Sequence, residues 1–307
     1  MPAKELHRIS FQGTGSGPHL LITAGVHGDE YEGIEAIREL IRTIDSSKLR
    51  GKLTLIPVVN EPAYLRRSRT ADDDKDLART CPGSPDGTIT ERIAHRLAAE
   101  IREADYYIDL HTGGFRFKLL PLVGYMLHPD AKILDEQRRM ARAFGLPLIW
   151  GTSPHLDGRS LSVARDAGVP ALYAEHGGGG GCNPEGVRDY IRGCMNVMAE
   201  LGMLDESVEL HSTSPTIAPK VVEDPRPDSG HLQIHHPAPC EGYFRPAKQL
   251  GDSVTQGETL GSIIDLIGHE LATISANQSG TILLLADCPI IAPGDALAVI
   301  LESSLTS

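Results

Sequence analysis

The sequence predicts an α/β protein with a mostly parallel sheet flanked by helices, followed by a smaller C-terminal all-β region. Up to about residue 205, short apolar runs rich in β-branched residues alternate with segments of helical period. After about residue 210, prolines interrupt the chain repeatedly and no helical period returns. The length of 307 residues and the hydrophobic content of 40% are enough for a sizeable core. We expect an α/β domain over 1–210, then a linker and a β-domain over 211–307.

The elements follow from local patterns along the chain. Apolar runs predict strands at 20–26, 53–59, 106–110, 119–127, 146–150 and 169–174. Helical spacing of apolar residues predicts helices at 34–44, from about 90, and at 130–144, 161–167 and 184–204. In the C-terminal region, turn signals at 251–257 and 293–295 are flanked by aliphatic runs, which favours antiparallel strands.

Composition excludes several classes of partner. Lys and Arg total 29 against 41 Asp and Glu, and the formal charge of −12 repels nucleic acid. The apolar run nearest the N-terminus, 20–26, is too short to span a bilayer, so we expect no membrane partner and a cytoplasmic location. The five cysteines are widely spaced without a Cys-x-x-Cys pair, which indicates neither a disulfide framework nor a thiolate zinc site.

Four polar residues follow predicted strands at the point where each strand ends. His27 and Glu30 come after the first strand, His111 after the third and Glu175 after the last strand of the α/β region. Side chains that leave parallel strands at their carboxyl ends converge on one crevice. The His-x-x-Glu spacing with a distant histidine suits zinc with an open fourth position for water. The alternative is that both histidines are strand-end residues satisfied by backbone groups.

Two further features have a functional and a plain interpretation. The five glycines of 177–181 follow Glu175, so either Glu175 is a general base beside a metal-activated water or the run is simply a flexible loop. Four arginines lie in an aperiodic stretch after Asn60, which we expect to be a long loop, and they could recognise a carboxylate there or merely be solvated: Arg66, Arg67, Arg69 and Arg79.

A set of motifs runs in order along nearly the whole chain. They are Gly25-Val-His-Gly-Asp-Glu30, Asn60 with Pro62-Ala63, Arg69, Asp76-Leu77 with Arg79 and Pro82-Gly83, Asp109-Leu-His-Thr112, and Gly168-Val-Pro170 leading to Glu175. This set resembles the succinylglutamate desuccinylase/aspartoacylase family, which are zinc hydrolases related to carboxypeptidases. The resemblance implies a zinc-exopeptidase-like α/β domain that hydrolyses the amide bond of a small carboxylate-bearing N-acyl amino acid.

The resemblance also implies a role for each matched residue. One Zn²⁺ per chain would be held by three ligands: His27, Glu30 and His111. Glu175 would be the catalytic carboxylate and Arg69 would polarise the scissile carbonyl. The substrate would be held by Arg79, which grips its carboxylate, together with Asn60 and Arg159.

The chain departs from the family pattern at one position that bears on substrate identity. The family's Asp-Leu-Asn-Arg is here Asp76-Leu-Ala78-Arg79, so an amide that helps to hold the substrate is missing. The glycine-rich stretch looks most like bacterial members that include N-acetyl-diaminobutyrate deacetylase, which is one candidate activity. The acyl group, the amino acid, the physiological metal and the oligomeric state, including a homo-oligomer, stay open.

The region from about residue 238 looks like the family's β-domain, which resembles the barrel-sandwich of lipoyl and biotinyl carriers. No lysine follows Lys248, so attachment of a prosthetic group there is excluded. Two alternatives to a deacylase remain. One is a carboxypeptidase-type peptidase with the same metal site, and the other is a non-catalytic protein with a relic metal site.

Overall fold

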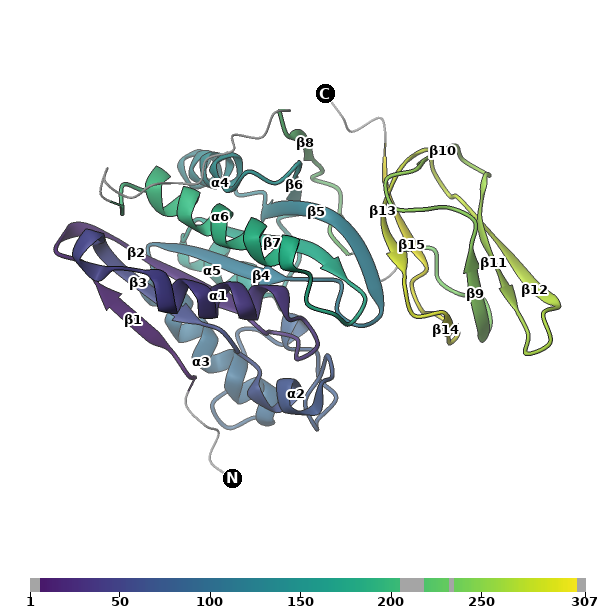
Figure 1. Cartoon of the computed structure of the whole chain (residues 1–307), viewed down its shortest axis with the longest axis horizontal. Helices are drawn as coiled ribbons and strands as arrows, with labels where there is room; N and C mark the ends of the chain where they lie inside the picture. The colour runs from purple at the N-terminus through teal and green to yellow at the C-terminus, as the bar shows by residue number, and fades with distance from the viewer. Residues whose placement is uncertain (1–5, 205–217, 232–234, 303–307) are drawn as a thin grey trace.

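The structure is a computed structural model that describes residues 6–204, 218–231 and 235–302. A large twisted sheet with helices on both faces forms the N-terminal part, and strands of the C-terminal part continue this sheet and build a second, smaller one (Figure 1). This arrangement confirms the predicted α/β class with an all-β region at the C-terminus. All five cysteines are free thiols.

The N-terminal part contains six helices and eight strands among the described residues. The helices are α1 (Glu32–Thr43), α2 (Glu61–Arg66), α3 (Ile89–Glu103), α4 (Ala131–Phe144), α5 (Ser160–Ala167) and α6 (Pro184–Glu200), with the short 3₁₀ turns η1 (Ser46–Lys48) and η2 (Leu77–Arg79). The strands are β1 (Ile9–Gln12), β2 (Gly15–Ala24), β3 (Arg50–Ile56), β4 (Tyr106–His111), β5 (Phe117–Met126), β6 (Leu148–Thr152), β7 (Ala171–Gly178) and β8 (Lys220–Glu223).

The order of strands in the large sheet places β2, β4 and β7 at its centre. The path runs β1-β3-β2-β4-β7-β5-β13-β10, with β6 beside β5, β8 beside β6 and β15 beside β13. The central pairs β3–β2, β2–β4 and β4–β7 are parallel, as predicted. The pair β7–β5 is antiparallel, so the sheet is mixed on that side.

Alternation along each strand fills two cores, because successive side chains point to opposite faces of a sheet. Leu20 and Ile22 of β2 pack into the core beneath α1, α4 and α6, whereas Leu21 packs into the core beneath α3 and α5. Helix starts agree with the sequence signals: Asp130 and Asn183 accept hydrogen bonds from the first turns of α4 and α6. The helical boundaries therefore follow from local capping as well as from apolar spacing.

The C-terminal part consists of β9 (Gly242–Pro246), β10 (Ser253–Val254), β11 (Thr259–Ile264), β12 (Glu270–Ser275), β13 (Gly280–Ala286), β14 (Ile290–Ile291) and β15 (Ala298–Glu302). A four-stranded sheet has the order β12-β11-β9-β14. β13 pairs with β5, with Leu284 opposite Leu119 and Ala286 opposite Phe117. The two parts of the chain thus share one continuous sheet, and Figure 1 shows β13 beside the curved part of β5.

Several features differ from the sequence-based expectations. The stretch after Asn60 was expected to be a long loop, but it contains the short helix α2 and the turn η2. α6 ends at Glu200 rather than near residue 204, because Gly202 takes a left-handed conformation with φ of 68°. β8 joins the large sheet beside β6. The boundary near residue 210 stays a prediction.

Among the described residues, no helix combines the length and apolarity needed to cross a bilayer.

Candidate active site

The loop from β2 to α1 positions His27 and Glu30, and two glycines let it do so. Gly25 directly follows β2 and adopts φ of 64°, a left-handed conformation that favours glycine. A Cβ atom on Gly28 would lie 2.0 Å from the carbonyl carbon of Ala63 in α2. The loop therefore packs directly onto the backbone of α2, which fixes the direction of both side chains.

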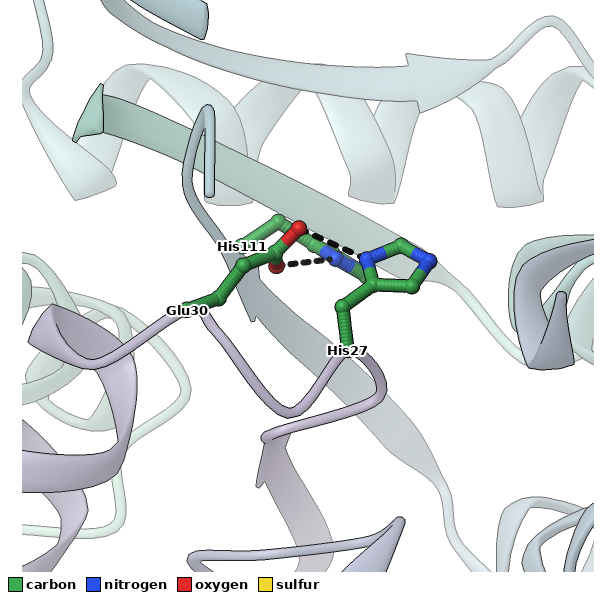
Figure 2. A group of neighbouring side chains, drawn as sticks. All are labelled: His27, Glu30 and His111. Atoms are coloured by element: carbon green, nitrogen blue, oxygen red, sulfur yellow. Dashed lines mark hydrogen bonds and ion pairs between the residues drawn. The ribbon is translucent and has the colours of Figure 1, made fainter. Parts of the chain in front are cut away.

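His27, Glu30 and His111 form one buried cluster. The Glu30 carboxylate contacts both rings: Oε1 is 2.6 Å from Nδ1 of His27, and Oε2 is 3.0 Å from Nδ1 of His111 (Figure 2). The three residues are only 3%, 2% and 9% exposed, respectively. One ligand atom from each residue falls within 4.8 Å of the other two. The structure therefore brings together the three residues that the sequence singled out as metal ligands.

The outer nitrogen of each histidine faces an aspartate. Nε2 of His27 is 3.0 Å from Oδ1 of Asp76, and Nε2 of His111 is 3.2 Å from Oδ2 of Asp109. Asp109 is in turn held by hydrogen bonds from the hydroxyl groups of Thr23 and Ser160. Carboxylates at the outer nitrogens orient imidazole ligands and favour the tautomer whose other nitrogen binds a metal.

The electrostatics of the cluster favour an ionised Glu30 carboxylate beside the two imidazole rings. Burial opposes ionisation of Glu30, but the two imidazoles outweigh it and hold the pKa of this carboxyl well below its usual range. Burial also disfavours the charged form of His111, yet Asp109 and Glu30 raise the pKa of its ring well above the usual value. Two imidazoles and one carboxylate with outer-nitrogen partners are a donor set that suits Zn²⁺ with one open position.

Glu175 is the register partner of His111 on the adjacent parallel strand β7. Its Oε2 atom is buried and has no hydrogen-bond partner among the described residues. Burial raises the pKa of the Glu175 carboxyl to about 8, while the charges of His111 and Arg69 lower it and that of Glu30 raises it. A buried carboxyl with a raised pKa beside a metal-binding cluster is a typical acid–base group.

Three of the arginines expected from the sequence lie at the same cavity. Arg69 donates to Oδ2 of Asp76 from Nη2 at 2.9 Å, and its Nη1 lies 3.7 Å from Oε1 of Glu30. Arg79, at the end of η2, is exposed at the rim and donates to the Ala78 carbonyl at 2.7 Å.

Arg159 precedes α5 and reaches across to the linker that joins the two parts of the chain. Its two Nη atoms donate to the Gly230 carbonyl at 3.3 and 3.4 Å. The Nε atom of Arg159 is buried and has no hydrogen-bond partner within the described part of the chain. Burial and the neighbouring charge of Arg79 lower the pKa of the Arg159 guanidinium to about 10. The Nε–H group of Arg159 is therefore available to donate a hydrogen bond to a further acceptor.

A small cavity of about 90 Å³ joins these groups. Its polar lining includes the metal cluster, Arg69, Arg79, Arg159 and Glu175. Three hydroxyl-bearing residues, Thr112, Thr152 and Ser160, also line it. Large aliphatic and aromatic side chains form most of the remainder: Phe117, Leu119, Met126, Leu161, Tyr173 and Leu284. Leu284 belongs to β13, so the C-terminal part of the chain supplies a piece of the cavity wall.

The structure does not bring Asn60 to this cavity. Asn60 is fully buried at the start of α2, where its Oδ1 atom accepts from the Ala63 amide and its Nδ2 atom donates to the Val26 carbonyl. This places Asn60 in a capping position that supports the loop of His27. Of the other arginines near it in sequence, Arg66 forms an exposed ion pair with Asp72.

Sequence reasoning missed the supporting roles of Asp76 and Asp109. Asp109 precedes His111 by two residues on one strand, and this spacing places both side chains on the same face. That signal was available from the sequence. No comparable signal connects Asp76 with His27, because α1, β3 and α2 lie between them in the sequence.

Comparison with known proteins identifies the family. The succinylglutamate desuccinylase/aspartoacylase catalytic domain matches residues 16–201, which is more than half of the chain. The chain belongs to the succinylglutamate desuccinylase/aspartoacylase family. This finding confirms the resemblance that the motifs indicated, and it makes the chain an amidohydrolase.

Several relatives match over almost the full length. N-α-acetyl-L-2,4-diaminobutyric acid deacetylase from Halomonas elongata is 30% identical over 297 residues, covering 94% of this chain and 83% of that protein. A succinylglutamate desuccinylase/aspartoacylase structure from Rhodobacter sphaeroides has a TM-score of 0.84 and 30% identity, covering 96% of this chain and 88% of that one. The product-bound ectoine utilization protein EutE (DoeB) from Ruegeria pomeroyi also has a TM-score of 0.84, with 27% identity and coverage of 96% and 88%.

Proposed function

We propose that this protein is a zinc-dependent deacylase that hydrolyses the amide bond of a small N-acyl amino acid. The observation that carries the proposal is that a His-Glu-His cluster, a buried carboxyl with a raised pKa and three arginines all line one small cavity. Each group has a part in amide hydrolysis. The names of the full-length relatives describe the same reaction class.

The metal would be held by His27, Glu30 and His111, with Asp76 and Asp109 orienting the two rings. Bound there, Zn²⁺ supplies a Lewis acid that polarises a carbonyl and lowers the pKa of a water molecule to about 7. The remaining parts of the reaction fall to side chains of this chain.

Glu175 performs the proton transfers in the proposed mechanism. Its carboxylate takes a proton from the attacking water as the new carbon–oxygen bond forms, and then delivers that proton to the departing nitrogen as the carbon–nitrogen bond breaks. The products are a carboxylic acid and a free amino acid. A carboxyl whose pKa is raised by burial to about 8 is suited to both steps near neutral pH.

The arginines of the cavity stabilise negative charge during the reaction and bind the substrate carboxylate. Arg69 is oriented by Asp76 before the reaction begins, so its guanidinium can stabilise the negative charge that develops on the carbonyl oxygen. Arg79 and Arg159 have no carboxylate within 4.0 Å among the described residues and are assigned to the substrate carboxylate. Asn60 instead acts by supporting the loop that holds His27.

The wall that Leu284 adds to the cavity favours a deacylase over a carboxypeptidase-type peptidase. A peptide chain needs an open cleft, whereas this cavity of about 90 Å³ is bounded on one side by Leu284 from the C-terminal part. The presence of all three ligands together with Glu175 also disfavours a non-catalytic relic. A cytoplasmic location stays a prediction from the composition.

The decisive experiment measures amine release from a panel of N-acetyl and N-succinyl amino acids, with dipeptides as comparison substrates. We expect turnover of an acyl amino acid by zinc-loaded protein and its loss in a chelator-treated control. Faster turnover of dipeptides would favour the peptidase. If zinc-bound protein releases no amine from any compound of either panel, the deacylase proposal is wrong.

A further inference from the structure

The cavity presents three chemically different walls. The metal cluster with Glu175 forms the reacting wall, and Arg79 with Arg159 forms a cationic wall. The third wall is apolar and is built mainly by β5 and β13, the two strands through which the two parts of the chain pair. A substrate must match all three walls at once, so their chemistry constrains its substituents.

The apolar wall is made of fixed side chains. Leu119 and Leu284 are direct partners across β5 and β13 and are 3% and 2% exposed. The Tyr173 ring packs against Gly124, where a Cβ atom would lie 2.3 Å from the ring. The missing side chain of Gly124 therefore leaves the space that the ring occupies. At Leu119 and Leu284, close packing of this kind gives a surface that accepts methylene groups and cannot solvate a charge.

The carboxylates around the cavity are already engaged in the reaction. Among the described residues that line the cavity, the acidic ones are Glu30 and Glu175. Glu30 contacts two imidazoles and Glu175 is the proposed proton-transfer group. No carboxylate among the lining residues is therefore left to pair with a cationic substrate side chain.

The cationic wall opposes a second positive charge. Arg79 and Arg159 line the same cavity, and burial together with the charge of Arg79 lowers the pKa of the Arg159 guanidinium to about 10. An anionic group between them offsets this positive charge, whereas an ammonium group adds to it. One substrate carboxylate satisfies the cationic wall and leaves the apolar wall for the side chain.

From these walls we infer that the deacylase selects N-acyl amino acids with an uncharged, aliphatic side chain and rejects those with a side-chain ammonium group. The inference rests on the proposed function and specifies its substrate class. In this respect the chain differs from the Halomonas elongata relative, whose name specifies diaminobutyric acid. Leu119 and Leu284 are the residues assigned to the selection.

The first test compares kcat/KM for N-acetyl-L-leucine, N-acetyl-L-2,4-diaminobutyrate and N-acetyl-L-aspartate with zinc-loaded full-length protein. We expect the leucine compound to exceed each charged compound by at least about tenfold. Preference for either charged compound would overturn the inference while leaving the deacylase function standing. No turnover of any N-acyl amino acid in this set or the wider panel would overturn the proposed function itself, and the inference with it.

The second test introduces a charge into the apolar wall. In L284E, the ratio of kcat/KM for the diaminobutyrate compound to that for the leucine compound should rise at least about tenfold. This ratio is measured on one protein preparation, so it is unaffected by the fraction that folds. An unchanged ratio would show that Leu284 does not select the side chain.

A matched pair of milder variants separates selectivity from stability. Leu283 is 1% exposed, as deeply buried as Leu284, but it does not line the cavity. L284A and L283A should therefore lose comparable stability, while only L284A should raise kcat/KM for N-acetyl-L-phenylalanine relative to N-acetyl-L-leucine. Equal ratios in the two variants would contradict the assignment.

Discussion

His111 and Glu175 are direct partners on the neighbouring parallel strands β4 and β7. Both lie at the carboxyl end of the sheet, where parallel strands deliver side chains to one crevice. This register places a proposed metal ligand beside the proposed acid–base group without any help from a flexible loop. Site residues carried by adjacent strands are held more precisely than residues on loops.

Replacing Glu175 with glutamine should abolish turnover while zinc stays bound, because Glu175 is assigned to proton transfer and not to ligation. We expect kcat to fall by about 10²–10⁴-fold. Metal content measured by atomic absorption should equal that of the unaltered protein. A variant that loses its zinc would place Glu175 among the ligands, and a variant that keeps its kcat would remove it from the mechanism.

Asp76 should strengthen metal binding through His27. In D76N the outer nitrogen of His27 loses its carboxylate partner, so zinc affinity should fall about 10–100-fold. Competition with a chromogenic chelator measures this change. D72N is the matched control, because Asp72 is an exposed carboxylate that pairs with Arg66. Equal affinities in the two variants would contradict the role of Asp76.

Arg79 and Arg69 should affect different kinetic constants. R79A removes an interaction that is the same in the ground and transition states, so we expect a higher KM and a nearly unchanged kcat. R69A removes charge stabilisation that develops during the reaction, so kcat should fall by about 10²–10³-fold. R66A, at an exposed ion pair, serves as control. The reverse pattern would exchange the two assignments.

Removal of the metal should reduce both activity and stability. A ligand that binds only the folded state stabilises it, by about 2.7 kcal/mol at a free concentration 100 times its Kd. Chelator-treated protein should therefore unfold at a lower temperature in calorimetry, and added zinc should restore Tm and activity together. Full activity in a metal-free preparation would refute the zinc proposal.

Gly28 should be intolerant of any side chain. Its Cβ position collides with the Ala63 backbone, so G28A must shift the loop that carries His27 and Glu30. We expect about 1–3 kcal/mol of destabilisation in denaturant unfolding and weaker zinc binding. G181A is the control, since Gly181 has no atom within 4 Å of its Cβ position. Similar losses in both variants would count against this account of the loop.

Local patterns in the sequence were sufficient for most helices and strands of the α/β region. Apolar periodicity and capping residues such as Asn183 depend on neighbours within a few positions, so they can be read without the tertiary structure. For the same reason, polar residues at strand ends identified His27, Glu30 and His111, which the structure then brought together. Asp109 was accessible by the same logic, two residues before His111.

Other features were decided only by the tertiary structure. The antiparallel pairing of β5 with β7, the pairing of β5 with β13 and the contact of Asp76 with His27 join segments that are distant in sequence. Asn60 does not line the cavity, because the segment after it folds into α2. The Asn60 side chain caps the first turn of this helix. Such pairings are selected by total burial and hydrogen bonding over the whole chain, and a local window contains no information about which distant segment will satisfy them.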